Sequence, residues 1–221
     1  MKIIQPSVEL IDIINPADIL AKIERCGRVS HQSESKGNPE GFIQNIIMLG
    51  HESVLEHVSL TFHIICDRAI QNELVRHRHA SFTVESTRYV KYNNIEVIAP
   101  DFGELQSTPD TRYEMIFNDE NEVVFQQYPD TFQAWKMAVE GAENIYRFLI
   151  TQGATPEQAR AVLPLCLKSE LYMTANLREW RHILKLRTDK AAHPQMRFIA
   201  GRILAILREK LPVIVEDIGG D

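Results

Sequence analysis

The sequence is poor in cysteine and has no long apolar run, and both facts narrow what the protein can be. Its three cysteines, Cys26, Cys66 and Cys166, lie far apart among apolar neighbours, which favours buried free thiols over a disulfide framework. No stretch approaches the roughly 20 apolar residues of a membrane-spanning helix, and the N-terminus lacks the apolar core of a signal peptide. We therefore expect a cytoplasmic protein that does not enter a membrane.

The motifs of common nucleotide-binding folds are missing as well. The sequence contains no GxGxxG, no P-loop and no CxxC pair, which disfavours Rossmann and P-loop sites. If a nucleotide binds, arginines must hold it. The formal net charge of -6 also argues against a general nucleic-acid binder, whose surface would be basic, so we expect no nucleic-acid partner.

The length and composition suit one globular domain. With 221 residues, of which 44% are hydrophobic, the chain can bury a substantial core. We expect a single domain over residues 1–221, of the α+β class, with a mixed sheet flanked by long helices. The acidic stretch 101–122 is predicted to be a solvated insertion.

Local patterns predict the individual elements. Branched and aromatic residues predict strands over about 1–14 and 58–66, and a polar loop over about 30–38. Helical spacing and N-terminal caps predict helices over about 17–26, 39–49, 67–77, 123–152, 176–188 and 193–210, and a helix that opens at 155 and carries Arg160. Thr155 and Asn176 begin two predicted capping boxes, and Gly50 is a predicted C-cap.

One short segment concentrates positive charge. Residues 76–91 contain Arg76, His77, Arg78, His79, Arg88 and Lys91, against the single acid Glu85. Clustered arginines repel one another unless an anion neutralises them, and a planar guanidinium can donate two hydrogen bonds to phosphate oxygens. The segment therefore predicts an anion site, with Ser86 as a hydroxyl donor. A solvated basic face, or a nucleic-acid-binding module built on this segment, are the alternatives.

The predicted helix over 176–188 carries a second cluster. Its positions 177, 180, 184 and 187 share one face, occupied by Leu177, Trp180, Leu184 and Arg187. A partly buried arginine at the end of an apolar stripe needs a partner, which is either an internal carboxylate or a ligand. On another face, Arg178 and His182 are expected to join Asn176 in holding a second anion near the helix N-terminus.

Histidines raise the alternative of a metal hydrolase using His51, His57, His77 and His79. The first two are six residues apart, which does not match HExxH, and arginines flank the other two. We therefore expect no metal. Ser86 lies in no GxSxG elbow, so we interpret it as a binding hydroxyl and not as a nucleophile.

The basic segment resembles the signature of the flavin-dependent thymidylate synthases. The resemblance rests on Arg76-His77-Arg78, a gap of seven residues, Ser86, and then Arg88-Tyr89. Further similar segments are Cys26–Ser30, Gly50–His57, Ala159–Leu165, Thr174–Arg178 and Leu186–Arg187. The acidic stretch 101–122 matches no element of that family.

The resemblance implies an activity and an assembly. It implies synthesis of dTMP from dUMP, with methylenetetrahydrofolate as carbon donor, FAD as hydride carrier and NADPH as reductant. It also implies a homotetramer with active sites between subunits. Arg187 would stabilise negative charge on the uracil, so that no enzyme nucleophile is needed.

The resemblance also assigns site residues. The dUMP site would comprise Glu73, Arg76, Glu85, Ser86, Thr87, Arg88, Arg160 and Arg187. The FAD site would comprise Ser30, His51, Ser53, Glu56, Arg76, His77, Arg78, Val84, Asn176, Arg178 and His182. Glu73, Val84 and His182 depart from the residues common in the family, and a carboxylate at Glu73 would repel a phosphate unless it is paired.

Overall fold

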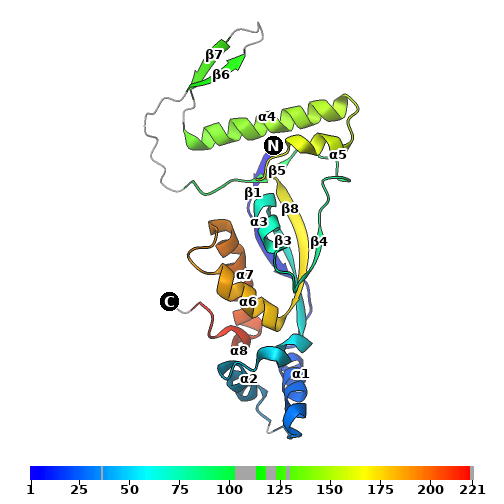
Figure 1. Cartoon of the computed structure of the whole chain (residues 1–221), viewed down its shortest axis with the longest axis vertical. Coiled ribbons are helices and arrows are strands. Elements are labelled where there is room, and N and C mark those ends of the chain that lie inside the picture. Colours follow the sequence, from blue (N-terminus) through cyan, green and yellow to red (C-terminus); the bar gives the residue numbers. More distant parts are fainter. Residues whose placement is uncertain (36, 103–112, 118–122, 128–129, 220–221) are drawn as a thin grey trace. The chain divides into compact units, whose positions relative to one another are not determined.

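The structure is a computed structural model that describes residues 1–35, 37–102, 113–117, 123–127 and 130–219 (Figure 1). The chain divides into two compact units. Unit 1 comprises Met1–Ile4 and Ser86–Leu167, and unit 2 comprises Gln5–Glu85 and Lys168–Asp221. Single-domain organisation over the whole chain stays a prediction.

Unit 2 is built on a four-stranded sheet with the order β2-β3-β8-β4. The strands are β2 (Ser7–Leu10), β3 (Ser59–Asp67), β8 (Lys168–Asn176) and β4 (Ser81–Val84), and all neighbours are antiparallel. Side chains alternate across the two faces of β3, so that Leu60, Phe62 and Ile64 are buried. This alternation gives the sheet one face that packs on the core.

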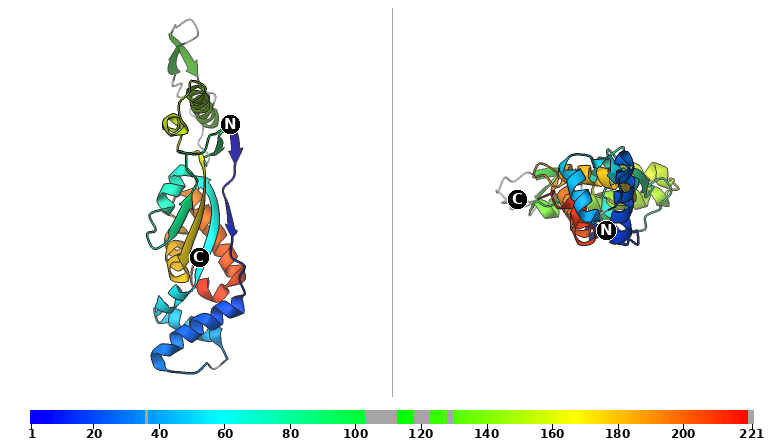
Figure 2. Two further views of the ribbon diagram at one scale, coloured as in Figure 1. Left: turned by 90° about the vertical axis from the view of Figure 1, so that its right-hand side faces the viewer. Right: turned by 90° about the horizontal axis from the view of Figure 1, so that it is seen from below.

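Helices cover that face of the sheet. Unit 2 contains α1 (Pro16–Arg28), α2 (Pro39–Met48), α3 (Arg68–Leu74), α6 (Leu177–Arg187), α7 (Pro194–Lys210) and α8 (Pro212–Val215), with 3-10 turns η1 (Val29–His31) and η2 (Glu52–His57). In the left view of Figure 2 the strands of unit 2 lie in front of α6 and α7. Trp180 of α6 joins the layers, since its ring meets Phe62 edge-on at 4.9 Å and its indole N–H donates to the Leu60 carbonyl (3.0 Å).

The capping residues start and stop these helices as predicted. Asp67 accepts the Ile70 N–H (2.7 Å), Asn176 accepts the Glu179 N–H (2.9 Å) and His193 begins α7. Gly50 follows the end of α2 with φ 72°, a conformation that glycine adopts at no steric cost. The sequence therefore specifies the local boundaries well.

Unit 1 is smaller and has its own core. Strand β1 (Lys2–Ile4) lies parallel to β5 (Glu96–Ile98), and α4 (Thr131–Thr151), α5 (Pro156–Ala159) and η3 (Arg160–Val162) follow. Ile95, Val97, Val139 and Leu167 form its cluster of buried core residues. The capping box at Thr155 is present in both directions, as predicted.

Several predicted boundaries are wrong. Residues 123–127 form strand β7 (Val123–Gln127), which pairs antiparallel with β6 (Tyr113–Phe117), and the helix begins only at Thr131. Val-Val-Phe content suits a strand better than a helix. Strand β6 also lies inside the predicted solvated insertion, of which 103–112 and 118–122 fall outside the described residues.

Other boundaries shift because of tertiary pairing. The predicted strand over 1–14 is two strands in different sheets, on either side of Pro6, which cannot donate to a ladder. The predicted helix over 67–77 ends at Leu74, and Arg160 lies at the C-terminal cap of α5, where it begins the 3-10 turn η3. Strand β8 was not predicted.

The α+β class with a mixed sheet arrangement is confirmed. Among the described residues, none of the helices combines the length and apolar composition needed to cross a bilayer.

Candidate active site

Helix α6 carries three of the predicted site residues, Arg178, His182 and Arg187, and Asn176 caps it. It follows β8 without a loop, because Asn176 both ends the strand and caps the helix, so the sheet fixes the helix direction. Leu177, Trp180 and Leu184 are fully buried, as the predicted apolar stripe requires. The opposite face, with Arg178 and His182, is therefore directed outward.

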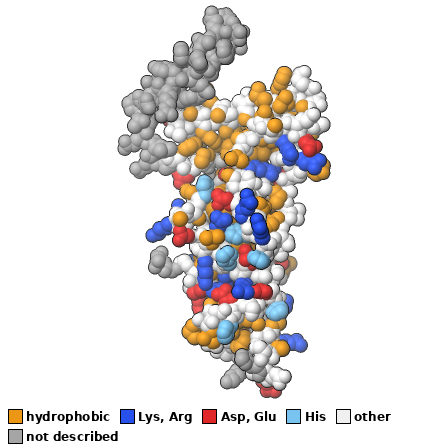
Figure 3. Space-filling view, in the orientation of Figure 1, with side chains coloured by type: hydrophobic (Ala, Val, Ile, Leu, Met, Phe, Trp, Pro, Cys, Tyr) orange, Lys and Arg blue, Asp and Glu red, His pale blue; other side chains and the backbone are white. Residues whose placement is uncertain are grey.

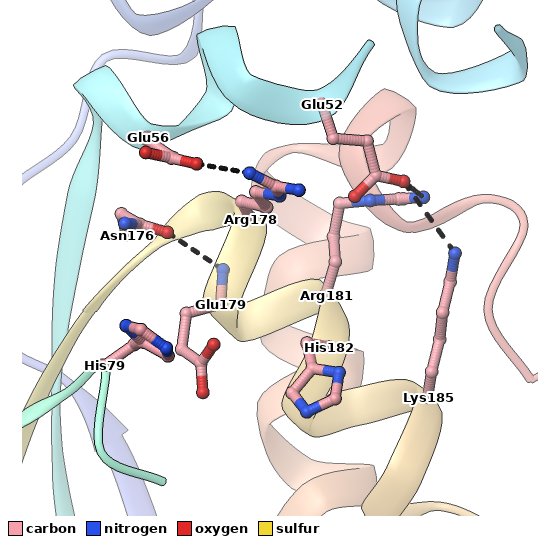
Figure 4. A pocket seen from close by; sticks show the side chains of 9 residues that line it. All are labelled: Glu52, Glu56, His79, Asn176, Arg178, Glu179, Arg181, His182 and Lys185. Carbon is pink, nitrogen blue, oxygen red and sulfur yellow. Dashed lines mark hydrogen bonds and ion pairs between the residues drawn. The ribbon is translucent and has the colours of Figure 1, made fainter. Parts of the chain in front are cut away.

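A cavity of about 600 Å³ lies over this outward face (Figure 4). It is lined by Glu52, Glu56, His79, Asn176, Arg178, Glu179, Arg181, His182 and Lys185. Four of these residues, Glu56, Asn176, Arg178 and His182, belong to the set that the resemblance assigned to FAD. The cavity size is in the range of about 300–1,000 Å³ that small-molecule sites occupy.

Ion pairs build the walls of this cavity. Arg178 donates to Glu56 at 2.5 Å, with both side chains about half exposed. Arg181, of which 1% is exposed, binds Asp217 (2.6 and 2.9 Å), Glu52 (2.9 Å) and the Ile214 carbonyl. The Arg181 contacts tie η2 and the C-terminal segment to α6, so they hold the cavity wall in place.

Arg187 ends the apolar stripe of α6 and has two partners. Its Nη1 donates to Glu73 Oε2 (3.2 Å) and its Nε donates to His77 Nε2 (3.1 Å). Burial lowers the pKa of His77 to about 4, and the charges of Arg187 and His182 act in the same direction. Glu73 is therefore paired with Arg187, which is the internal carboxylate alternative of the sequence analysis.

His77, Glu179 and His182 come close enough to raise the question of a metal. One ligand atom from each lies within 4.8 Å of the others, and this is a group that sequence spacing did not indicate. However, Arg187 donates to His77 Nε2, and a guanidinium beside a ligand nitrogen repels a divalent cation. The Arg187 contact argues against a cation at His77, and the absence of a metal stays a prediction.

Unit 1 brings together a separate set of predicted residues. Arg160 Nη1 donates to Thr87 Oγ1 (3.3 Å), Arg88 Nε lies 3.1 Å from Glu157, and the Arg88 N–H donates to Ser86 Oγ (3.3 Å). Arg88 and Arg160 are exposed. Segments 86–88 and 157–160, far apart in sequence, are thus in contact within this unit. Their role in an anion site stays a prediction.

The other predicted site residues of unit 2 lie at exposed positions or on an edge strand of the sheet. Arg76, Arg78, His51 and Ser53 are exposed in unit 2, the last on η2. Val84 ends β4, an edge strand of the sheet.

Two predicted residues are already engaged. The Ser30 hydroxyl donates to the Gly27 carbonyl (2.9 Å). The backbone N–H of Glu85 donates to the Glu170 carbonyl, its carbonyl accepts from Arg68, and its carboxylate binds Lys168 (2.7 Å).

Sequence reasoning missed part of the cavity lining. The missed residues are Glu52, His79, Glu179, Arg181 and Lys185. Lys185 lies seven positions after Arg178 and three after His182, so helical spacing alone is a sufficient signal for it. Arg181 has no such signal, because its partners Asp217 and Glu52 are distant in sequence.

Charges of both signs share the surface around these clusters. On the face drawn in Figure 3, basic side chains lie interleaved with acidic ones and do not form a uniform basic surface. Such mixing suits discrete anion sites formed by a few arginines. The face drawn in Figure 3 does not carry the continuous basic stripe of a nucleic-acid interface, and the absence of a nucleic-acid partner stays a prediction.

Comparisons with known proteins show which family the chain resembles. A family model described as "Thymidylate synthase complementing protein" matches residues 9–213. A flavin-dependent thymidylate synthase of Corynebacterium aurimucosum is 33% identical over 203 residues, which cover 89% of this chain and 79% of that relative. A probable flavin-dependent thymidylate synthase of Mycobacterium phage L5 is 36% identical over 211 residues, or 91% of this chain and 81% of the relative.

One solved structure is similar over nearly the whole chain. It is the UMP/dUMP methylase PolB from Streptomyces cacaoi, bound with 5-Br dUMP. The TM-score is 0.75 at 28% sequence identity, and the match covers 97% of this chain and 95% of that chain.

Proposed function

The chain belongs to the family of the thymidylate synthase complementing proteins, and on that premise we propose that it is a flavin-dependent enzyme that methylates dUMP to dTMP. The names of its relatives and the dUMP analogue in the similar structure support this substrate and this class of reaction. Methylenetetrahydrofolate is proposed as the carbon donor and NADPH as the reductant.

The observation that carries the proposal is the state of Arg187. A guanidinium has five N–H donors, of which Nε–H and one Nη1–H are used by His77 and Glu73. Three donors (five minus two) have no partner among the described residues. A partly buried cation with open donors, held by a neutral imidazole, is suited to stabilise negative charge at the N3 and O4 edge of a uracil.

The flavin fits the cavity over α6 through its anionic part. The 11-residue helix presents its N-terminus there, and Arg178 adds a guanidinium in the first turn. Arg178 would exchange Glu56 for a phosphate oxygen, a small cost because both side chains are about half exposed. Asn176 and His182 would contribute hydrogen bonds, and we propose that Arg76, His77, Arg78, Ser30, His51, Ser53 and the Val84 backbone complete the flavin site.

The dUMP phosphate would be held by the cations of the signature segment. We propose Arg76, Ser86, Arg88 and Arg160 as phosphate ligands, with Thr87 adding its backbone N–H. The contact between Arg160 and Thr87 supports the convergence of these segments. Glu73 would face the nucleotide as the partner of Arg187. Both backbone groups of Glu85 are engaged, so Glu85 would act by shaping the segment and not by donating.

The reaction requires little covalent chemistry from the protein. The one-carbon unit of methylenetetrahydrofolate would form a bond to C5 of the uracil, its bond to the folate nitrogen would break with release of tetrahydrofolate, the C5 proton would be lost, and a hydride would reduce the transferred carbon to a methyl group. The flavin, when bound, would supply that hydride after reduction by NADPH. Arg187 would favour the electron-rich uracil that attacks the carbon donor, and Ser86 would bind phosphate without forming a covalent bond.

The assembly and location are proposed along with the activity. We propose a homotetramer with active sites between subunits, and exposed apolar side chains such as Met48 (77% exposed) and Val29 (73%) support a partner surface. Light scattering on the purified protein measures the mass of the assembly and so tests the proposed tetramer. A cytoplasmic location is proposed because Cys26 and Cys66 are free thiols.

The test combines flavin uptake with product formation. The purified protein should bind FAD, and with dUMP, methylenetetrahydrofolate and NADPH it should form dTMP. Arg187→Ala should retain FAD binding but lose about 10²–10³ in kcat, the usual cost of one preorganised charge donor. Arg202→Ala, at an exposed position of α7, is the matched control and should leave kcat unchanged.

Two results would contradict the proposal. A protein that takes up no FAD and forms no dTMP is not this enzyme. Near-normal turnover in Arg187→Ala would remove Arg187 from its proposed role while leaving the overall activity in place.

A further inference from the structure

Two groups hold the guanidinium of Arg187 from different sides. Glu73, on α3, contacts Nη1, and His77, after the end of α3, contacts Nε. Contacts at two separate nitrogens fix the plane of the fork as well as its position. The His77 ring is itself immobile, since 5% of its side chain is exposed and its Nδ1 lies 3.7 Å from Glu179 Oε1.

The Arg187 contact determines the tautomer of His77. A guanidinium only donates, so the His77 nitrogen that faces it must carry a lone pair. The ring of neutral His77 then has its proton on Nδ1, directed towards the Glu179 carboxylate. Because burial and neighbouring charge lower the pKa of His77 to about 4, the ring is neutral near pH 7.

We propose that His77 is a positioning residue: as the Nδ1–H tautomer it accepts the Nε–H of Arg187 and directs the remaining donors of that guanidinium to the uracil. This inference rests on the proposed function. It gives His77 a role that acts through Arg187, in addition to any contact with the flavin.

A neutral acceptor has a specific advantage at this position. Glu73 already supplies one negative charge to Arg187. A second carboxylate in place of His77 would give the group a net negative charge and oppose charge development on the substrate. An imidazole fixes the orientation of the fork without cancelling more of its charge, which is what preorganised electrostatic stabilisation requires.

A double-mutant cycle separates this role from simple loss of structure. With flavin saturating, His77→Leu should lower kcat about 10- to 100-fold, the effect of losing one hydrogen bond to a charged donor, with a smaller change in KM for dUMP. His77→Gln retains an acceptor oxygen and should recover part of the loss. Lysine has no guanidinium Nε–H, so in an Arg187→Lys background His77→Leu should lower kcat by less than about threefold further, because the effects of coupled residues are not additive.

His182 provides the matched control. It is a second imidazole of the cavity, its ring centroid lies 6.3 Å from that of His77, and no hydrogen bond joins it to Arg187 among the described residues. The factor by which His182→Gln changes kcat should therefore be the same in the wild-type and Arg187→Lys backgrounds.

A spectroscopic readout tests the contact without activity. In ¹H–¹⁵N NMR spectra of the flavin-loaded protein, the Nε–H of Arg187 should exchange slowly with water. That protection should vanish in His77→Leu and persist in His182→Gln.

The outcomes distinguish the two proposals. If the wild-type protein makes no dTMP, the proposed function fails. The positioning role alone is refuted if the wild-type protein is active and His77→Leu is fully active. It is also refuted if His77→Leu lowers kcat by the same factor in the wild-type and Arg187→Lys backgrounds. Unchanged Nε–H protection in folded His77→Leu also refutes it.

Discussion

Replacing Asp217 by Asn perturbs the ion cluster around the buried Arg181, which joins the C-terminal segment to α6. Asp217 binds both terminal nitrogens of Arg181, and Lys185 lies 3.1 Å away. The Arg181 hydrogen bonds lower the pKa of Asp217 from 3.8 to about 2, and the Lys185 contact acts in the same direction. Because Asn has nearly the same shape without the charge, Asp217→Asn isolates the electrostatic contribution.

The magnitude follows from that pKa shift. A shift from 3.8 to about 2 corresponds to at most about 2.4 kcal/mol, at 1.36 kcal/mol per unit. Water screens the pair, since 39% of the Asp217 side chain is exposed, so we expect a loss of about 1 kcal/mol in the free energy of unfolding. For a chain of this length, that loss lowers Tm by about 2–4 °C.

The loss should depend on pH with a defined sign. The folded-state pKa of Asp217 is below its unfolded value, so the stabilisation is complete above pH 3.8 and is lost as pH falls through about 2. Urea unfolding of the wild type and Asp217→Asn, compared from pH 7 to pH 2, measures this. Other titrating groups, His77 included, cancel in the difference between the two proteins.

A neighbouring carboxylate supplies the control. Glu216 is exposed and contacts Gln44 only weakly, at 3.4 Å, so Glu216→Gln should leave stability within about 0.5 kcal/mol of wild type. Equal stability of Asp217→Asn and wild type at pH 7, or a difference that stays constant down to pH 2, would refute the reasoning.

Three other predictions concern unit 2. A Cβ at Gly27 would lie 2.7 Å from the ring of Phe42, so Gly27→Ala should destabilise the protein by about 1–3 kcal/mol, and Phe42→Leu should relieve the loss in thermal melts. Burial raises the pKa of the Cys66 thiol to about 12, so it should resist thiol reagents at pH 8 until the protein is unfolded; modification under native conditions would contradict this. The His77 ring should stay neutral from pH 8 to 5 in an NMR titration. The pKa of His77 falls from 6.5 to about 4 on folding, so its contribution lowers the free energy of unfolding as pH falls from 6.5 to about 4. A titration midpoint near 6.5 for the folded protein would contradict this prediction.

Local signals predicted much of the fold. The caps at Asp67, Thr155 and Asn176 and the apolar stripe of α6 involve residues three to four positions apart, and all are present. Of the two predicted capping boxes, the one at Thr155 is complete, whereas at Asn176 only the bond from the Glu179 N–H is found. Strand β8 escaped prediction because its stability comes from pairing with β3, more than 100 residues away in sequence. Strand β7 is a different case, because it pairs with the neighbouring strand β6, and its branched residues were interpreted as the start of a helix.

The sequence alone determined which charged groups are available and in which order: the arginines of 76–88, Arg160, and the Arg178–Arg187 helix, in an arrangement specific enough to indicate the family. Only the tertiary structure decided which of them are already neutralised. Arg187 meets Glu73 and His77 across 114 and 110 residues of chain, and Arg181 meets Asp217 across 36. Such contacts depend on how strands and helices pack, and so does the burial that keeps His77 neutral; no short-range pattern of residues encodes either.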